Sequence, residues 1–216
     1  MKKFRISVSD SPIQCLISKD KKLAKVINLI GDIECDVFTD SFAFIVKEIV
    51  GQMLSNKVAD VIANRLTDRC VGGISAETVR RLGIEGLREI GVSYSKSRYI
   101  LNFAEEVSNG NISFDTLKKL PDRQIMERLM SVKGIGSWTS KMYLIFVLQR
   151  PDVLPYEDGA FIQSFKWLYA TNDASRATIE NRCKKWKPYS SIASRFLYRA
   201  LDLGFTKKPF RLYNVN

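Results

Sequence analysis

The chain has 216 residues, of which 45% are hydrophobic, enough for a packed core in one large or two small domains. Lysine and arginine number 34 against 23 aspartates and glutamates, so the net charge is +11. A charge of that sign favours a polyanionic partner such as nucleic acid, the alternative being a basic surface without such a partner. The absence of histidine excludes catalytic triads, zinc sites and acid-base chemistry that depend on imidazole.

The cysteines stand far apart and form no CxxC pair: Cys15, Cys35, Cys70 and Cys183. This spacing suggests neither a zinc ribbon nor a disulfide scaffold, so we expect buried or idle thiols. No apolar run is long enough to span a membrane, since Lys47 interrupts the best one, and the basic start MKKFRISVSD lacks a signal-peptide core. We therefore expect a soluble, cytoplasmic protein, associated with the nucleoid if its source is bacterial.

The start of the chain is the only part with a β pattern. Phe4, Ile6 and Val8 alternate, which predicts a weak strand within the segment that ends at Ser18. After it every element reads as helical. Asp40 is a natural N-cap, and apolar residues at three-four spacing then predict one buried helix face: Phe42, Ile45, Val46, Ile49, Val50 and Met53.

Further helices follow as a string of short elements. Ser95 is the expected cap of a helix that runs to Val107, and Pro121 begins the helix before the turn at Gly134. The remaining expected helices cover 58–66, 76–82, 84–90, 137–149, 159–169, 175–186 and 188–203. With no linker or clear repeat, residues 1–216 are predicted to form one all-α domain of two lobes, about 38–150 and both chain ends, with a groove between them.

The sequence VKGIG, residues 132–136, separates two expected helices. Its glycines allow positive φ and close approach of a partner, and the turn exposes backbone amides next to a helix N-terminus. Such amides suit a phosphate oxygen, and Lys133 and Lys141 add positive charge near Gly134 and Gly136. The alternative is an ordinary αα-hairpin with a glycine cap.

The stretch LMSVKGIGSWTSKM, residues 129–142, resembles the helix-hairpin-helix of the DNA glycosylase superfamily. The resemblance runs in order over roughly residues 20–203, and it implies a two-lobed helical fold that binds DNA. Four other stretches resemble further parts of the superfamily: IVGQMLSNKVADVIANRL (49–66), LREIGVSYSKSRYILNFAEEV (87–107), VLPYEDGAFIQSF (153–165) and WKPYSSIASRFLYRAL (186–201).

Trp138 decides which branch the chain resembles. Members that also cut the strand carry a lysine two residues after the second glycine of the hairpin, and an indole cannot form a Schiff base. The resemblance therefore implies a monofunctional glycosylase of the alkylated-base branch, like bacterial 3-methyladenine-DNA glycosylase II. Cys183 is the one cysteine in the last third of the chain, too few for an iron–sulfur cluster. No cofactor is expected beyond a structural Na⁺ or K⁺, which the resemblance implies at backbone carbonyls around Gly134 and Gly136.

The resemblance to the superfamily's aspartate loop implies that Asp158, three residues after Pro155, is the catalytic carboxylate. It would stabilise the positive charge that develops on deoxyribose when an alkylated purine departs. Glu157 could do similar chemistry, but the spacing from Pro155 favours its neighbour. The plainer reading of Asp158 is an N-cap for the helix that begins at Gly159, which is compatible with the catalytic role.

A flipped base needs a pocket and a wedge. Trp138, Tyr156 and Tyr189 are the candidate pocket aromatics, although aromatics at helical spacing are more often core residues. Met53 stands where this branch places an apolar wedge, with Leu54 as the alternative plug and Gln52 beside them. The expected partner is double-stranded DNA with damaged bases, bound by a monomer.

Two departures and two alternatives remain. Relatives often have glutamine where Met53 stands and arginine where Ser190 stands, so the wedge and the support of the active site differ here. A non-catalytic helix-hairpin-helix protein that binds bent or damaged DNA would keep the hairpin and not need Asp158, and a glycosylase for another lesion is the third reading.

A cluster of lysines is expected to form a solvated face: Lys184, Lys185 and Lys187.

Overall fold

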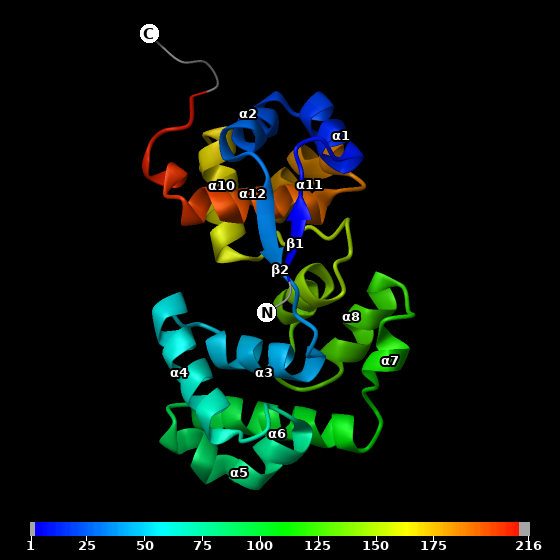
Figure 1. Ribbon diagram of the computed structural model, residues 1–216, viewed down its shortest axis with the longest axis vertical. Helices are drawn as coiled ribbons and strands as arrows, with labels where there is room; N and C mark the ends of the chain where they lie inside the picture. Colours follow the sequence, from blue (N-terminus) through cyan, green and yellow to red (C-terminus); the bar gives the residue numbers. More distant parts are fainter. Residues whose placement is uncertain (1–2, 212–216) are drawn as a thin grey trace. The chain divides into compact units, whose positions relative to one another are not determined.

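The structure, a computed structural model, describes residues 3–211 and is helical apart from one small sheet (Figure 1). The prediction of an all-α fold is therefore confirmed. The chain divides into two compact units: the terminal unit, made of residues up to Val37 and from Gln149 on, and the central unit, Phe38–Leu148. The groove between two lobes and the single domain over 1–216 stay predictions.

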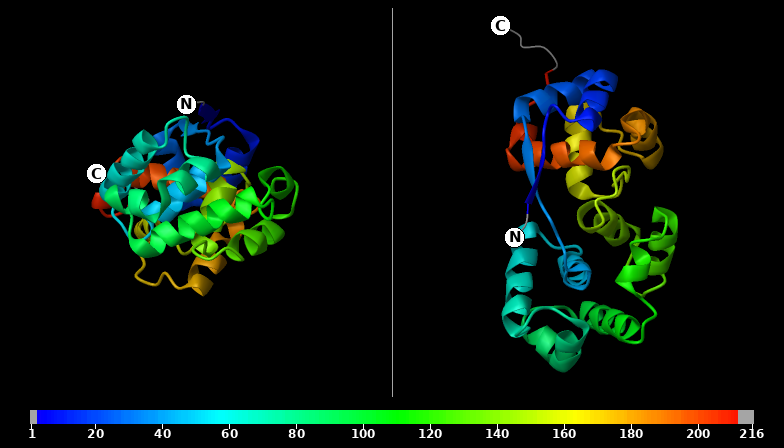
Figure 2. Two further views of the ribbon diagram at one scale, coloured as in Figure 1. Left: turned by 90° about the horizontal axis from the view of Figure 1, so that it is seen from below. Right: turned by 45° about the vertical axis from the view of Figure 1, so that its right-hand side comes forward.

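Both units are built from short helices, seen from two further directions in Figure 2. The terminal unit contains β1 Lys3–Ile6, α1 Ser11–Lys19, α2 Lys21–Ile30, β2 Ile33–Asp36, α10 Gly159–Tyr169, α11 Arg176–Cys183, the 3₁₀ turn η2 Lys184–Trp186, α12 Ser190–Asp202 and the 3₁₀ turn η3 Phe205–Lys207. The central unit contains α3 Ser41–Gly51, α4 Asn56–Arg69, α5 Ala76–Glu89, α6 Tyr94–Ser108, α7 Phe114–Leu117, α8 Asp122–Met130, α9 Ser137–Met142 and the π-helical turn η1 Tyr143–Val147.

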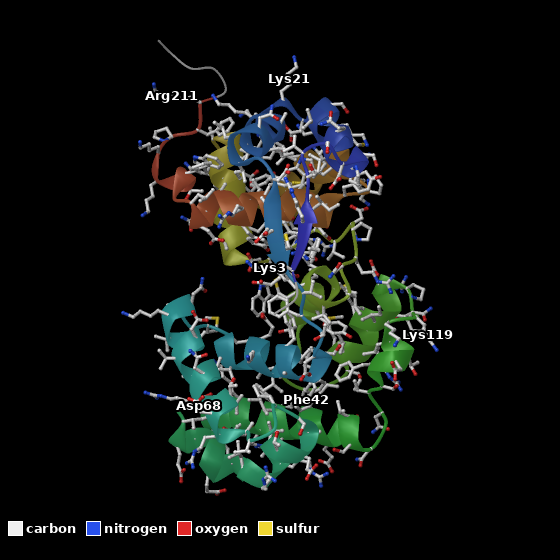
Figure 3. The ribbon with its side chains drawn as sticks, viewed as in Figure 1. Lys3, Lys21, Phe42, Asp68, Lys119 and Arg211 are labelled. Carbon is white, nitrogen blue, oxygen red and sulfur yellow. The ribbon has the colours of Figure 1, made fainter. Side chains whose placement is uncertain are left out.

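The sheet consists of β1 and β2, which pair antiparallel from Lys3 opposite Asp36 to Ile6 opposite Ile33 (Figure 3 labels Lys3). The predicted strand at the start of the chain is confirmed, but the β reading up to Ser18 is wrong, because Pro12 lies in the first turn of α1. Strand β2 was not predicted. Its sequence IECD alternates apolar and polar residues, and its burial alternates with them, so the strand signal was present but was not used.

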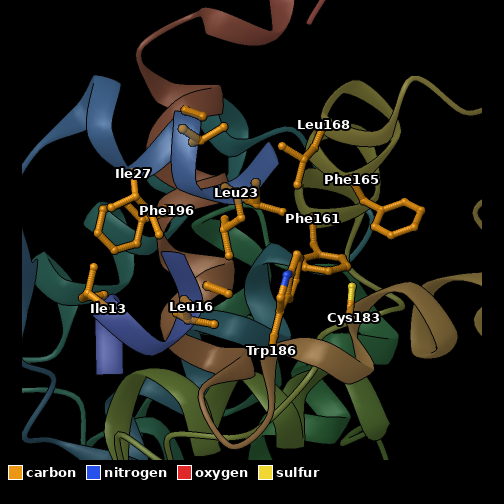
Figure 4. Packing of buried hydrophobic residues seen from close by; sticks show 14 of the residues in the cluster. Ile13, Leu16, Leu23, Ile27, Phe161, Phe165, Leu168, Cys183, Trp186 and Phe196 are labelled. Atoms are coloured by element: carbon orange, nitrogen blue, oxygen red, sulfur yellow. The ribbon is translucent and has the colours of Figure 1, made fainter. Parts of the chain in front are cut away.

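The core of the terminal unit joins the two ends of the chain. Trp186 is fully buried against the edge of Phe161, with ring centroids 6.3 Å apart. Leu16 and Leu23 from α1 and α2 and Phe196 from α12 enter the same cluster (Figure 4). Each buried aromatic ring removes about 150–250 Å² from water, so this packing holds together segments more than a hundred residues apart in the sequence.

A buried carboxylate, that of Asp20, lies beside this core and caps α2 through the backbone N–H of Lys22. It also accepts hydrogen bonds from Tyr169 Oη at 2.5 Å and Trp186 Nε1 at 2.9 Å, and pairs with Lys185 Nζ at 3.1 Å. Burial alone would raise the pKa of Asp20, but these donors outweigh it and hold the pKa below its ordinary value. The sequence pattern did not predict this cluster.

The central unit is organised around aromatic rings. Phe42 on α3 stacks on Phe103 of α6 with centroids 5.1 Å apart, and Phe114 meets the edge of Phe103 at 6.3 Å. Phe114 also lies 6.3 Å from Tyr143, whose hydroxyl is 3.2 Å from that of Ser41. The predicted apolar face of α3 is therefore the one that packs inward, and it fixes α3 against α6 and η1.

Some predicted boundaries need correction. The cap of α6 is Ser93, not Ser95, because the Ser93 hydroxyl accepts the N–H of Lys96. The expected helix 137–149 is α9 followed by the wider turn η1. The predicted interruption of 76–90 is confirmed, since Gly83 leaves helical geometry inside α5 with a φ of 65°. All four cysteines are free thiols, and three of them are buried.

Candidate functional site

The turn between α8 and α9 needs its two glycines for different reasons. Gly134 has a φ of 97°, and a Cβ added to it would lie 2.3 Å from Cγ of Tyr99 on α6. Gly136 has an extended φ of −101°, with open space where a Cβ would be. The first glycine is required by the fold, whereas the second leaves an exposed backbone that a ligand can approach closely.

The two lysines predicted beside this turn differ in exposure. Lys133 is exposed at the turn itself. Lys141 is only 6% exposed, because α9 buries every residue from Thr139 to Met142. Lys133 is therefore the lysine that can meet an approaching phosphate directly, and a phosphate contact of the buried Lys141 stays a prediction.

The carbonyls of Gly134 and Gly136, predicted to hold a monovalent cation, already accept hydrogen bonds. The Gly134 carbonyl accepts Nε2 of Gln52 at 3.0 Å. The Gly136 carbonyl accepts the N–H of Ser140 at 3.1 Å and its hydroxyl at 3.0 Å, which uses both lone pairs. The Gly134 carbonyl keeps one lone pair, and a monovalent cation at backbone carbonyls of this region stays a prediction. Within residues 3–211 no group of three or more cysteine, aspartate or glutamate side chains could hold a metal ion.

The chain makes a sharp turn after α3, at the candidate wedge. Met53 has a φ of 58° and is fully exposed, so the prediction that it belongs to the buried face of α3 is wrong: the helix ends at Gly51. Leu54 is 38% exposed, and its N–H returns to the carbonyl of Gly51. Gln52 is half-buried and its amide points to the hairpin, not to solvent. Of the three candidates, Met53 has the side chain that a nucleic acid can reach most readily.

The candidate catalytic carboxylate lies at the start of α10. Asp158 is 9% exposed, and its Oδ1 accepts the N–H of Phe161 at 2.8 Å, so the N-cap reading is confirmed. Its own N–H donates to the carbonyl of Pro155 at 3.0 Å. Glu157, the alternative, is exposed. Capping one amide does not exhaust a carboxylate, which can accept about four hydrogen bonds. A preoriented, mostly buried negative charge of this kind can act electrostatically on a bound cation.

The loop that leads to Asp158 is held to the start of α12. Oδ1 of Asp152 accepts the hydroxyl of Ser190 at 2.5 Å and its N–H at 3.2 Å. The Ser191 hydroxyl accepts the N–H of Val153 at 2.8 Å, and the Ser191 N–H donates to the carbonyl of Pro151 at 2.9 Å. Sequence reasoning noted Ser190 as a departure and missed this support. The serine pair next to Tyr189 was its one local signal.

The three candidate pocket aromatics lie in two units. Tyr156 and Tyr189 are half-buried against the core of the terminal unit, and the guanidinium of Arg176 stands 4.7 Å from the centroid of the Tyr156 ring. Trp138 is half-buried in the first turn of α9, in the central unit. One face of Tyr156 therefore already holds a cation. That these aromatics share a pocket stays a prediction.

The predicted lysine face near the end of η2 is exposed at Lys184, Lys185 and Lys187, although Lys185 also pairs with Asp20. No helix among residues 3–211 has the length and apolar character needed to cross a membrane.

Comparison with known proteins gives consistent matches. The family model described as "HhH-GPD superfamily base excision DNA repair protein" matches residues 46–188. The crystal structure of DNA-3-methyladenine glycosidase from Bacillus halodurans is 30% identical, with a TM-score of 0.83 over 98% of this chain and 97% of that chain.

Two curated relatives extend the comparison. The alkylbase DNA glycosidase-like protein mag2 of Schizosaccharomyces pombe is 28% identical over 85% of this chain and 90% of its own length. The DNA-3-methyladenine glycosylase of Bacillus subtilis is 30% identical over 58% of this chain, which is 42% of that protein. The matched part thus spans less than half the length of the Bacillus subtilis relative.

Proposed function

The chain belongs to the HhH-GPD superfamily of base excision DNA repair proteins, and on that premise we propose that it is a monofunctional DNA glycosylase. Its proposed reaction is hydrolysis of the N-glycosidic bond of alkylated purines, of the 3-methyladenine or 7-methylguanine type, in duplex DNA, which leaves an abasic site. The observation that carries the proposal is the carboxylate of Asp158, mostly buried and oriented at the start of α10.

The chemistry follows from the charge of the damaged base. A purine alkylated at N3 or N7 is cationic, so it leaves as a neutral base without a strong general acid. The electron deficit then moves to the sugar, which becomes oxocarbenium-like. Two unit charges about 4 Å apart at an effective dielectric of about 20 attract by roughly 4 kcal/mol, about three decades of rate. Asp158 supplies this negative charge and orients the attacking water in the proposed mechanism.

The absence of strand cutting is part of the proposal. Strand-cutting members of the superfamily use a lysine amine to form a Schiff base with the opened sugar. Trp138 stands at the corresponding place, two residues after Gly136, and an indole has no nucleophilic amine. Water is then the nucleophile, and the product keeps an intact strand.

The target base must leave the helix before it reacts. Met53 is proposed to fill the space that the flipped nucleotide leaves, as an apolar wedge between base steps. Exposed backbone at Gly136 and the charge of Lys133 are proposed to bind the phosphates of the damaged strand. Trp138, Tyr156 and Tyr189 are the proposed stacking partners of the cationic base. The protein acts as a monomer in this proposal, in the cytoplasm.

The test is release of free base from methylated duplex DNA. Asp158→Asn should lower the rate about a thousandfold. Binding to abasic-site DNA should persist, because asparagine still caps α10. Glu157→Gln, which removes the same charge one residue away, is the matched control and should stay near the wild-type rate.

Three results would contradict parts of the proposal. Release by Asp158→Asn near the wild-type rate would refute its catalytic role. Strand breaks without alkali would refute monofunctional action. Binding of damaged DNA by the wild type with no release of any alkylated base would favour the second candidate, a non-catalytic protein, which the "glycosidase-like" name of the Schizosaccharomyces pombe relative keeps open. A screen of other damaged bases then decides whether the lesion is of a different class.

A further inference from the structure

The turn at Met53 is held in an unusual conformation. A residue other than glycine at a φ of 58° is uncommon and strained. The side chain of Met53 is fully exposed and so gains nothing from burial inside the chain. The conformation therefore depends on contacts made by the residues beside it.

Lys96 of α6 supplies the first of these contacts. Its Nζ donates to the carbonyl of Val50 at 2.8 Å and to that of Gln52 at 2.6 Å, on the two sides of Gly51. The last four carbonyls of a helix lack partners within it, and an ammonium group satisfies them and complements the helix dipole. Burial lowers the pKa of Lys96, which agrees with an amine drawn in from solvent to this position.

Gln52 supplies the second contact. While its carbonyl accepts Lys96, its side-chain Nε2 donates to the Gly134 carbonyl at 3.0 Å, 82 residues further along the chain. The same Nε2 lies 3.4 Å from the Thr139 hydroxyl in α9. The residue directly before the wedge is thus hydrogen-bonded to the hairpin turn.

Helix α6 also contacts the hairpin directly. Tyr99 lies one turn after Lys96, and its ring packs so closely on Gly134 that no Cβ fits there. One helix therefore contacts both the carbonyls before Met53 and the backbone of the hairpin. Met53, the hairpin and α6 all belong to the central unit, so these contacts lie within one compact body.

We propose that Lys96 and Gln52 are positioning residues that fix the Met53 turn to the hairpin, so that the wedge and the phosphate-binding backbone act as one rigid element. The inference deepens the proposed function and rests on it for the role of Met53 as a wedge. A wedge on a loose turn would enter the duplex at variable depth, whereas a fixed one enters at a set distance from the bound phosphates.

Measuring DNA binding and base release separately tests whether Lys96 positions the Met53 turn. Lys96→Met keeps most of the side-chain volume and removes the donor, so binding to undamaged DNA should change less than twofold. Base release from methylated DNA should fall about tenfold, since displacement by about 1 Å in a bound complex costs up to a hundredfold. Lys119→Met, which removes an exposed lysine in the turn after α7 (Figure 3), is the matched charge control and should leave release unchanged.

A double-mutant cycle shows whether Lys96 acts through Met53. In a Met53→Ala background there is no wedge left to misplace, so Lys96→Met should add less than twofold to the loss. The same tenfold loss in both backgrounds would overturn the proposal. Gln52→Leu should reproduce the behaviour of Lys96→Met, and it replaces that variant in the cycle if Lys96→Met does not fold.

Amide hydrogen exchange on the free protein gives a readout that needs no catalysis. In Lys96→Met and Gln52→Leu the hydrogen-bonded amides of residues 52 and 54 should exchange at least tenfold faster than in the wild type, while those of the α10 start stay unchanged. Unchanged exchange at residues 52 and 54 would overturn the positioning role even if the wild type is an active glycosylase. If exchange is faster in the two variants but the wild type releases no base, the positioning role is upheld and only the glycosylase activity is refuted.

Discussion

In the terminal unit Asp158 lies mostly buried before the first turn of α10, whereas in the central unit Met53 stands fully exposed after the last turn of α3. Short side chains and backbone groups hold the Asp158 loop: the carboxylates of Asp158 and Asp152 and the hydroxyl of Ser190. Long side chains hold the Met53 turn by reaching backbone groups far away in the sequence: Lys96 reaches the carbonyls of Val50 and Gln52, and Gln52 reaches that of Gly134.

The difference follows from the two ends of a helix. A helix start exposes N–H groups and attracts an anion, so the carboxylate of Asp158 stabilises α10 and is oriented by it. A helix end exposes carbonyls and attracts a cation, so Lys96 stabilises α3. In the first case the charged group is itself the proposed catalyst. In the second, the Lys96 ammonium only stabilises the fold, and the residue that it supports, Met53, carries the proposed function.

Of the substitutions considered for stability, replacing Gly134 should lower the free energy of unfolding most. Gly134→Ala puts a side chain at positive φ and a Cβ 2.3 Å from Tyr99, so we expect the free energy of unfolding to fall by about 3 kcal/mol. Chemical denaturation measures this loss. Gly110→Ala is the control: its φ of 76° is also positive, but nothing lies within 4 Å of the added Cβ, so only about 1 kcal/mol should be lost. Equal losses in both variants would show that close packing on Tyr99 contributes nothing.

Asp20 and Asp158 are both buried aspartate caps in the terminal unit, and comparing their variants sharpens the contrast between fold and function. Asp20→Asn should lower the free energy of unfolding by about 2 kcal/mol, because Tyr169, Trp186 and Lys185 lose a charged acceptor. Base release by the folded protein should stay near the wild-type rate. A stability near wild type for Asp20→Asn would contradict this reading.

The pH dependence of stability in the wild type and Asp20→Asn tests whether the charge of the Asp20 carboxylate causes this difference. The pKa of Asp20 is below its ordinary value of 3.8 in the folded protein, so its stabilisation is complete above that pH. It is lost as the pH falls through the folded-state pKa, where the carboxylate takes up a proton in both states. The difference in unfolding free energy between wild type and Asp20→Asn should therefore be constant near neutral pH and shrink below about pH 4.

The smallest expected effect is that of loosening the Asp158 loop. Ser190→Ala removes one donor to Asp152 and keeps the backbone N–H. The lost hydrogen bond is worth about 1 kcal/mol, and because it holds the Asp158 loop we expect the rate of base release to fall about fivefold. Steady-state kinetics on methylated DNA measures it. A drop in the turnover rate at unchanged affinity for abasic-site DNA indicates a displaced loop, and unchanged turnover would mean that the hydrogen bond to Asp152 does not position Asp158.

Local signals made much of the site predictable. The positive φ of Gly134, the cap formed by Asp158 and the inward face of α3 each depend on residues within a few positions along the chain. The order of motifs around them was enough to recognise the superfamily. Met53 was misplaced on the α3 face because its apolar character continued the helical spacing past the point where the helix ends.

The sequence by itself determined the helical class, the hairpin and the carboxylate before α10, because short-range geometry decides each of them. Only the tertiary structure decided that Lys141 is buried, that Lys96 reaches carbonyls 44 and 46 residues away, and that Asp20 meets Tyr169 at a separation of 149 residues. A lysine or an aspartate on a helix surface has the same local pattern whether it meets water or a partner. Which of the two it meets depends on packing between distant segments, and no local spacing encodes that choice.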